Sequence, residues 1–587
     1  MKPRTHRTDT RPRLYALAAA LGLCGAALVV RAVDLQFVDS QFYQQQGDAR
    51  FLRDLPIATS RGTITDRNGE PLAVSSPVES IWVNPKELMA SRSRFAELAT
   101  ALNIDQAVLE ARISQRADRE FVYLRRHMNP DEADSILALE IPGVYSQREF
   151  RRFYPQGEVM AHVLGFTNID DQGQEGLELA FDDWLAGEPG LKRVIRDRRG
   201  RIVENVDLIR PAEPGHDLTL SIDRRLQYLA YRELKTAILE NSASSGSVVA
   251  LDIKTGEILA MVNQPSFNPN ARDGGEPAAR RNRAVTDVFE PGSVIKAFTV
   301  TAALETGKFS PDTPIETAPG YITVGGHTVH DISYFGTVSP TRLLTKSSNV
   351  ASIKLAAEMS AEHMHDVLYR FGFGRTTGSG FPGEAAGVLN SPQSWGTLEK
   401  ATIAFGYGVS VTALQLAQAY AAIGNQGVMV SPSFVHGNRG EQRTVIDPHL
   451  AKQLMAMLET VTGPEGSAKT ARVTGFRVAG KTGTSRQAVA GGYQKRYISL
   501  FAGLVPASDP RFAVVVMIND PTGSNYYGGQ VAAPVFGRMM EAALRVMDVP
   551  PDNLQQWLAA VPPEPGVDQT IAADGVPDDL LRAVAPR

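Results

Sequence analysis

A serine and a lysine that could act together stand three positions apart in the segment EPGSVIKAF, as Ser293 and Lys296. A helix that begins after the preceding Pro-Gly pair would place both side chains on one face. Serine becomes a nucleophile when a neighbouring base takes its proton, and partial burial beside a second cation can leave a lysine neutral enough to be that base. Backbone N–H groups at the helix start would face a developing oxyanion. The pair therefore indicates acyl transfer through a serine, although an isolated pair of this kind also arises by chance.

A hydroxyl and an amide follow in the segment TKSSNVASIK, as Ser347 and Asn349. Both groups donate and accept hydrogen bonds, so they are suited to passing on a proton and to holding a substrate amide. An earlier Ser-Phe-Asn, at Ser266–Asn268, precedes the candidate nucleophile and lies in a region expected to form loops.

The tripeptide Lys-Thr-Gly occurs twice. The copy in VAGKTGTS supplies a cation at Lys481, hydroxyls at Thr482 and Thr484, and a glycine, Gly483, that lets the backbone come close to a ligand. The copy at Lys254–Gly256 joins two apolar runs, which predicts the turn of a β-hairpin. Only the later copy completes the order Ser-x-x-Lys, Ser-x-Asn, Lys-Thr-Gly, which is typical of penicillin-binding proteins and β-lactamases.

The N-terminus indicates a membrane anchor. The first thirteen residues carry five basic side chains and one acidic one, and the uncharged run Leu14–Val30 then ends at Arg31. This run is at the short end of the roughly 17–25 residues that a membrane-spanning helix needs. We expect a cytoplasmic tail over 1–13, a transmembrane helix over 14–33 and, by the positive-inside rule, an extracytoplasmic remainder. A cleaved signal peptide is the alternative, and a lipoprotein at Cys24, the only cysteine, is a weaker one.

The rest of the chain divides at PAEPG, Pro211–Gly215, which is the clearest linker. Before it, residues 32–54 indicate a helix that continues away from the membrane, and Asn-Gly within 67–70 predicts a β-turn. After it, strands at both ends of the segment with helices between them are typical of an α+β domain with an antiparallel sheet, whose first helix Ser221 or Asp223 would cap. The expected domains are a non-catalytic pedestal over 34–215, a catalytic domain over 216–549 and a flexible, proline-rich tail over 550–587.

Composition and residue spacing give no indication of several other classes of function. A formal net charge of −4, from 60 basic and 64 acidic side chains, gives no indication of nucleic-acid binding. His162, His330 and His436 are not at the spacing of paired metal ligands, so we expect no metal site and no cofactor. With one cysteine, no disulfide is expected.

Three segments ahead of the linker resemble the pedestal motifs of class B penicillin-binding proteins of the cell-division type: RGTITDRNGEPLA at 61–73, RRFYPQGEVMAHVLGFTN at 151–168 and GQEGLE at 173–178. The segment GEILAMVNQPSFNPN resembles the strand and loop ahead of that family's active serine. The resemblance implies an α+β, serine β-lactamase-like transpeptidase domain with a five-stranded antiparallel sheet flanked by helices. It also implies an elongated pedestal and one transmembrane helix.

The same resemblance implies a role for each candidate residue. The reaction would begin when the serine attacks a D-Ala-D-Ala carbonyl and releases D-Ala, and an amine of a neighbouring stem peptide would then resolve the acyl-enzyme. Aromatic side chains, among them Tyr526 and Tyr527, are expected near an acyl-enzyme that must exclude water. The N–H groups of Ser293 and Thr484 would form the oxyanion hole. The implied catalytic residues are Ser293 as nucleophile, Lys296 as general base, Ser347, Asn349 and Lys481; the implied substrate-binding residues are Thr482, Gly483, Thr484 and Tyr407.

The resemblance also implies partners and a location. The substrates would be peptidoglycan stem peptides on lipid-linked glycan strands, and β-lactam antibiotics would bind covalently at Ser293. The protein partners would be a division glycosyltransferase and other divisome membrane proteins. The chain would cross the bacterial inner membrane once, with its catalytic domain in the periplasm at the division septum.

Three alternatives stay open. An elongation-type transpeptidase would share the three motifs, although QGDARFLR at 46–53 and the asparagine at position 349 resemble the division type. A β-lactamase or D,D-carboxypeptidase would hydrolyse its substrate and would need neither pedestal nor anchor. A catalytically idle division scaffold or penicillin sensor would have no need for the complete set of motifs.

Overall fold

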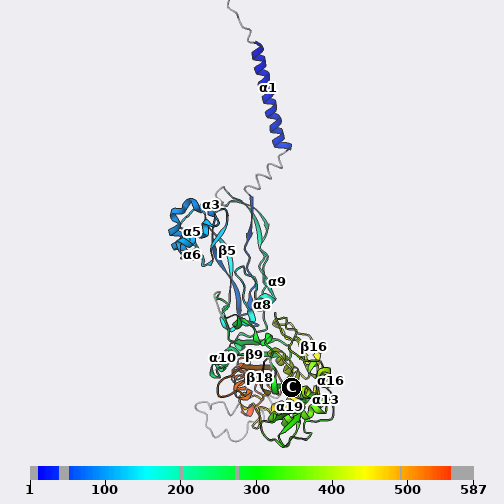
Figure 1. Ribbon diagram of the computed structural model, residues 1–587. Coiled ribbons are helices and arrows are strands. Elements are labelled where there is room, and N and C mark those ends of the chain that lie inside the picture. Colours follow the sequence, from blue (N-terminus) through cyan, green and yellow to red (C-terminus); the bar gives the residue numbers. More distant parts are fainter. Residues whose placement is uncertain (1–10, 39–51, 197–201, 272–275, 490–491, 557–587) are drawn as a thin grey trace, which may run out of the picture. The chain divides into compact units, whose positions relative to one another are not determined.

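The computed structural model describes residues 11–38, 52–196, 202–271, 276–489 and 492–556 (Figure 1). These form two compact units. The boundary at Gly215 coincides with the expected linker, but residues 62–75 and 152–185, inside the expected pedestal, belong to the second unit, called the catalytic unit below. The first unit takes its described residues from Met1–Arg61, Ser76–Arg151 and Ala186–Gly215, and the catalytic unit from Gly62–Ser75, Arg152–Leu185 and His216–Arg587.

A long apolar helix, α1 (Arg11–Val33), begins the described part of the chain. It belongs to the candidate membrane span Arg11–Gln36, whose mean hydropathy is 2.1, and none of this span is buried against the protein. Among the described residues it is the one helix long and apolar enough to cross a membrane. A short π-helix, η1 (Asp34–Val38), follows it.

The first unit contains a three-stranded sheet in the order β1 (Leu52–Ile57), β6 (Gly190–Arg196), β7 (Ile202–Arg210). The helix expected over 32–54 is wrong for its last three residues, because these lie in β1. Residues 39–51 lie outside the described part. These residues are extended because β1 pairs along its whole length with β6, in antiparallel fashion. Their local sequence pattern does not predict this pairing.

The first unit also has a small hydrophobic core of its own, which contains side chains such as Phe95, Leu98 and Leu124. The strand β3 runs from residue 71 into this unit and pairs there with β4 and β5. The elements around this core are β3 (Pro71–Val83), β4 (Val122–Met128), β5 (Val144–Phe153), α4 (Phe95–Leu102), α5 (Gln106–Ser114) and α6 (Pro130–Leu137).

The three segments quoted above as pedestal motifs meet inside the catalytic unit. Arg152, from the second segment, donates Nε–H to Oε1 of Glu178, from the third, at 2.6 Å. It also donates Nη1–H to the carbonyl oxygen of Gly62, from the first, at 2.7 Å. Because both charged side chains are almost free of solvent exposure, removing either one would leave a buried charge without its partner.

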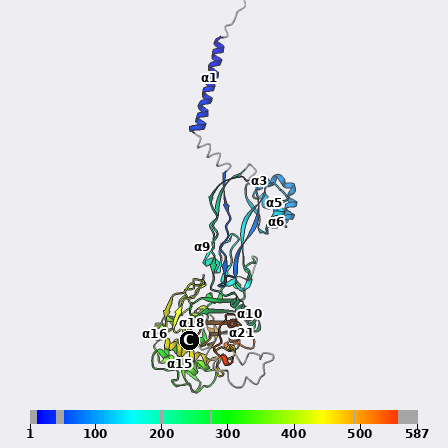
Figure 2. The ribbon, with the colours of Figure 1, turned by 180° about the vertical axis from the view of Figure 1, so that it is seen from behind.

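The catalytic unit is built on the expected five-stranded antiparallel sheet. Helices cover both faces: Gly503 of β18 lies against Phe536 of α21 (Ala533–Val546), whereas the next residue, Leu504, lies against Gly424 of α18 (Ala413–Gly424). Successive strand residues point to opposite faces, so the two helices are on opposite sides. Figure 2 shows α21 beside α10 (Arg224–Glu240). The strand order is β10 (Ile258–Gln264), β9 (Ser245–Asp252), β19 (Phe512–Asn519), β18 (Gly492–Val505), β17 (Ala479–Val489), which leaves β17 at one edge.

The first Lys-Thr-Gly copy forms the turn between β9 and β10, as predicted. Its Lys254 side chain is 60% exposed and forms an ion pair with Asp509 at 3.0 Å. The following Glu257 is buried and contacts Nη2 of Arg67 at 3.0 Å and Nδ1 of His436 at 2.8 Å. This copy therefore serves to join segments of the fold.

Two smaller expectations are resolved. Asp223 caps α10, whereas Ser221 does not, because its hydroxyl contacts two backbone carbonyl oxygens at 2.7 and 2.8 Å. The tail expected to be flexible from residue 550 begins with bonded residues, since Asp552 accepts the backbone N–H of Arg477 at 2.6 Å. Residues 557–587 lie outside the described part.

Candidate active site

Ser293 lies in a single 3₁₀ turn, η4 (Gly292–Ile295), which runs directly into α13 (Lys296–Glu305). Gly292 begins the turn with a φ of 54°, a conformation that favours glycine. Ser293 is half-buried, and Lys296 is fully buried. Side chains three residues apart eclipse one another in a 3₁₀ turn, so the serine and the lysine project to the same side.

The Lys296 amine is held by three groups of one turn. Its Nζ donates to the carbonyl oxygen of Ser347 at 2.6 Å and to Oδ1 of Asn349 at 2.8 Å, and lies 3.3 Å from the Ser347 hydroxyl. The two short bonds account for both hydrogens of a neutral amine and leave its lone pair for a proton. Burial places the pKa of Lys296 well below its ordinary value, and the charge of Lys481 lowers it further, against the opposite influence of Asp331.

A tight turn between α14 (Pro340–Lys346) and α15 (Asn349–Ala357) presents Ser347 to these lysines. Ser347 ends α14 in the left-handed conformation, with a φ of 63°. Ser348 is buried, and its hydroxyl accepts the N–H of Ala351 at 3.0 Å, which caps α15. The Ser-Ser-Asn segment therefore gives two side chains, Ser347 and Asn349, to the site and one, Ser348, to the fold.

Asp331 supports this turn, and sequence reasoning missed it. Its carboxylate accepts the hydroxyl of Ser348 at 2.7 Å and the N–H groups of Asn349 and Val350 at 2.5 and 3.0 Å. A carboxylate in this position satisfies free N–H groups at the helix start and interacts favourably with the helix dipole. No spacing rule could have identified it, because it reaches the helix from a separate loop.

Lys481, on β17, is fully buried, and burial lowers its pKa to about 7. Its Nζ donates to the Ser347 hydroxyl at 3.0 Å and to the carbonyl oxygen of Thr482 at 3.1 Å. The Ser347 oxygen thus accepts from Lys481 and lies near the Lys296 amine, and its own hydrogen remains available to a leaving group.

The two threonine hydroxyls of β17 are positioned by hydrogen bonds. Oγ1 of Thr484 accepts the N–H of Gly528 at 3.0 Å, so its hydrogen can be donated to an anion. Oγ1 of Thr482 lies 2.9 Å from Oγ of Ser467, and one hydrogen of this pair is likewise left over. Thr484 and one hydroxyl of the Thr482–Ser467 pair therefore have a hydrogen to donate to a substrate carboxylate.

Gly483, the glycine of the later Lys-Thr-Gly copy, allows two backbone segments to pack closely. A Cβ atom at Gly483 would lie 2.8 Å from the carbonyl oxygen of Pro291, and one at Gly292 would lie 3.1 Å from that of Thr484. These distances are shorter than ordinary van der Waals contacts. The two glycines therefore let β17 pack directly against the serine turn.

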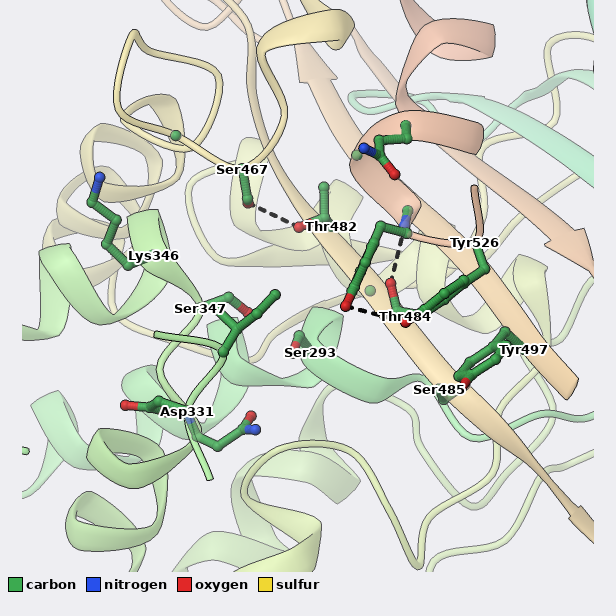
Figure 3. A pocket seen from close by; sticks show the side chains of 18 of the residues that line it. Ser293, Asp331, Lys346, Ser347, Ser467, Thr482, Thr484, Ser485, Tyr497 and Tyr526 are labelled. Carbon is green, nitrogen blue, oxygen red and sulfur yellow. Dashed lines mark hydrogen bonds between the residues drawn. The ribbon is translucent and has the colours of Figure 1, made fainter. Parts of the chain in front are cut away.

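A pocket of about 740 Å³ collects the site (Figure 3). Figure 3 shows Ser293 and Ser347 on its helical side, Thr482 and Thr484 on the facing strand, and aromatic side chains further along. Lys296 and Lys481 do not line the pocket; they lie buried beside Ser347. The expected residues that line it are Ser293, Ser347, Asn349, Tyr407, Thr482, Gly483, Thr484, Tyr526 and Tyr527.

Aromatic residues form part of the pocket, as expected. Tyr497 stacks on Tyr526 with ring centroids 4.1 Å apart, and Tyr526 stacks on Tyr527 at 4.5 Å. Tyr497 had not been identified, because it reaches the pocket through the register of β18 on β17, where it pairs with Arg486. Further lining residues that sequence reasoning missed include His330, Asp331, Ile332, Ser467, Arg486 and Gln530.

The site combines a half-buried serine, a buried base and donors for an anion. Comparisons with known proteins identify the family to which such a site belongs. Residues 246–541 match the family model of the penicillin binding protein transpeptidase domain, and residues 56–220 match that of the penicillin-binding protein dimerisation domain. This chain is a class B penicillin-binding protein.

Named relatives of this penicillin-binding protein span almost its whole length. It is 44% identical to the peptidoglycan D,D-transpeptidase FtsI of Escherichia coli K12, over 92% of this chain and 93% of that protein. It is also 44% identical to the probable peptidoglycan D,D-transpeptidase PbpC of Pseudomonas aeruginosa, over 91% of this chain and 95% of that protein. The crystal structure of penicillin binding protein 3 from Mycobacterium tuberculosis, complexed with aztreonam, matches with a TM-score of 0.65 and 29% identity, over 85% of this chain and 98% of that one.

Replacing Lys481 by alanine should slow acylation of this penicillin-binding protein by a β-lactam, on the order of 10²-fold or more, because a buried donor beside the nucleophile is lost. Lys254→Ala is the matched control, since it removes an exposed lysine from the same tripeptide. It should leave the rate unchanged. Time courses with a fluorescent penicillin measure both rates, and comparable losses in the two variants would contradict the assignment.

The acylation rate should fall as pH is lowered, because Lys296 must be unprotonated to take the proton of Ser293. Protonated Lys481 lowers the pKa of Lys296, so Lys481→Gln should raise that pKa and move the acid limb of the pH profile to higher pH. The limb is measured at saturating penicillin, which separates it from weaker binding. A limb that stays in place in this variant would show that the two lysines are not coupled.

Proposed function

We propose that this penicillin-binding protein is a peptidoglycan D,D-transpeptidase that cross-links stem peptides through an acyl-enzyme at Ser293. The observation that carries the proposal is the meeting of two buried lysines at the Ser347 hydroxyl, beside the half-buried nucleophile. Such a site supplies a base, a proton donor and an anion-binding strand in one pocket.

In the first half of the proposed reaction, Oγ of Ser293 attacks the carbonyl carbon of the penultimate D-Ala, and its proton passes to Nζ of Lys296. The hydroxyls of Thr482 and Thr484 hold the terminal carboxylate, with Lys481 behind them. The C–N bond breaks, and the leaving D-Ala takes a proton from the Ser347 hydroxyl. Ser347 regains a proton from protonated Lys296, whose Nζ lies 3.3 Å away, so Lys296 is neutral again for the second half. The backbone N–H groups of the nucleophile and of Thr484 would stabilise the oxyanion.

In the second half, an amine of a neighbouring stem peptide attacks the ester. The new C–N bond forms as the C–O bond to Ser293 breaks, and the proton that leaves the amine returns to Oγ of Ser293 through Lys296. Asn349, held by Asp331, is proposed to orient the acyl group through its side-chain amide. β-Lactams are proposed to acylate the same serine, as the aztreonam complex of the mycobacterial relative suggests.

A role in division follows from the relatives named FtsI. We propose that α1 anchors the chain in the inner membrane by a single pass, with the basic N-terminus in the cytoplasm and the catalytic unit in the periplasm at the septum. The proposed partners there are a division glycosyltransferase and other divisome membrane proteins. An elongation-type protein would carry out the same reaction at a different place in the cell.

Incubation of the detergent-solubilised chain with benzylpenicillin should add the mass of one intact β-lactam, because acylation opens the ring without losing atoms. Ser293→Ala should abolish this adduct. Ser266→Ala, which removes the serine of the earlier Ser-x-Asn segment, is the control and should retain it. Intact mass spectrometry makes the measurement, and a wild-type chain without an adduct would favour the idle scaffold instead.

Depletion of the protein in its own bacterium should produce long filaments without septa, because a septal cross-linking enzyme limits division and not growth. Complementation with Ser293→Ala should fail, and complementation with Lys254→Ala should restore septa. Loss of rod shape without filaments, scored by microscopy, would instead assign the chain to elongation.

A further inference from the structure

Glu290 lies three residues before Ser293 and connects the serine turn to three other segments. Its backbone carbonyl oxygen accepts the hydroxyl of Ser485, on β17, at 2.7 Å. Its side-chain Oε1 accepts the backbone N–H of Gly408 at 2.7 Å and the hydroxyl of Tyr493, on β18, at 3.0 Å. One residue therefore links the nucleophile's turn to two strands and one loop.

Tyr407 is the part of this arrangement that faces the substrate, because it lines the pocket whereas Glu290 does not. The ring of Tyr407 meets the ring of Tyr493 edge to face, with centroids 5.3 Å apart. Its hydroxyl accepts the backbone N–H of Arg486 at 3.2 Å. The carboxyl of Glu290 thus bonds to the backbone next to Tyr407 and to the ring that packs on it, so it holds this side chain from two directions.

Burying the Glu290 carboxyl costs more free energy than a purely structural link requires. Its Oε2 atom is buried and has no hydrogen-bond partner among the described residues, and a buried polar atom in that state destabilises the folded protein. Burial also raises the pKa of this carboxyl, against the hydrogen bonds from Gly408 and Tyr493. A group of this kind three residues from a nucleophile points to a role in the reaction.

The step that depends on Tyr407 is the second half of the reaction. An ester at Ser293 can be attacked by water as well as by an amine, and an aromatic ring fixed beside it excludes water. We propose that Glu290 is a positioning residue that, by holding Tyr407 and Tyr493, makes the acyl-enzyme react with an amine in preference to water. This role rests on the proposed transpeptidase function.

The test uses the full chain in detergent, a thioester of an N-acylated D-alanine as donor and D-alanine as acceptor. The measured quantity is the share of donor that is hydrolysed and not transferred. Glu290→Ala should raise this share several-fold. Glu290→Gln keeps an oxygen that can accept both hydrogen bonds and should stay close to wild type, and Tyr493→Phe, which keeps the ring but loses one bond, should fall between the two.

Glu384→Ala is the matched control. Glu384 also ties a loop of the catalytic unit, through bonds from Thr377 and Ser379, but does not line the pocket, and its variant should leave the hydrolysed share unchanged. An unchanged share in both Glu290→Ala and Tyr493→Phe, or an equal rise in the control, would overturn the role of Glu290. A wild-type chain that forms no penicillin adduct would overturn the proposed function itself, so the two failures are distinguishable.

Discussion

Two lysine side chains buried around one hydroxyl are the interaction on which the rest of the site depends. Lys296 and Lys481 have no exposed surface, and their Nζ atoms lie 3.3 and 3.0 Å from Oγ of Ser347. Two ammonium groups so close together in a dry site repel each other, so burial and mutual charge both favour the neutral amine. The chemistry requires a lysine that can accept a proton near neutral pH. The fold provides it by withholding water from a residue type that is ordinarily charged.

This arrangement requires that three elements far apart in the sequence be positioned accurately relative to one another. Lys296 begins α13, Lys481 lies on the edge strand β17, and Ser347 stands in a left-handed turn between two helices. The glycines at positions 292 and 483 let the strand and the serine turn touch, and Asp331 fixes the start of the helix that carries Asn349. Helices on both faces of the sheet then keep β17 from moving away from α13. The main contribution of the framework is therefore to set the distances between the reactive groups and to keep water away from the two lysines.

Sequence patterns were sufficient for the parts of this framework that have a local signature. The strands of the sheet, the helices between them and the three motifs all follow from periodicity and order, and the nine expected site residues either line the pocket or hydrogen-bond to Ser347. Asp331, Tyr497 and Glu290 were not identified, because each acts through partners on other segments and has no spacing of its own. The first three residues of β1 were predicted as helix for the same reason, since their pairing partners on β6 lie more than a hundred residues away. Membership of residues 62–75 and 152–185 in the catalytic unit likewise depends on buried contacts such as Arg152 to Glu178.

The two Lys-Thr-Gly copies show that residue identity alone does not determine chemistry. In the hairpin turn, the Lys254 side chain is 60% exposed and forms an ion pair with Asp509 on the surface. On β17, Lys481 is fully buried, and its pKa falls to about 7. The glycines also differ in use, since Gly256 takes a φ of 77° in a turn whereas Gly483 allows two backbones to touch. A tripeptide becomes part of an active site when its strand edge faces a nucleophile that the remainder of the fold has already placed. For this reason the position of Lys481 after Ser293 and Ser347 in the chain was informative, whereas the tripeptide itself was not.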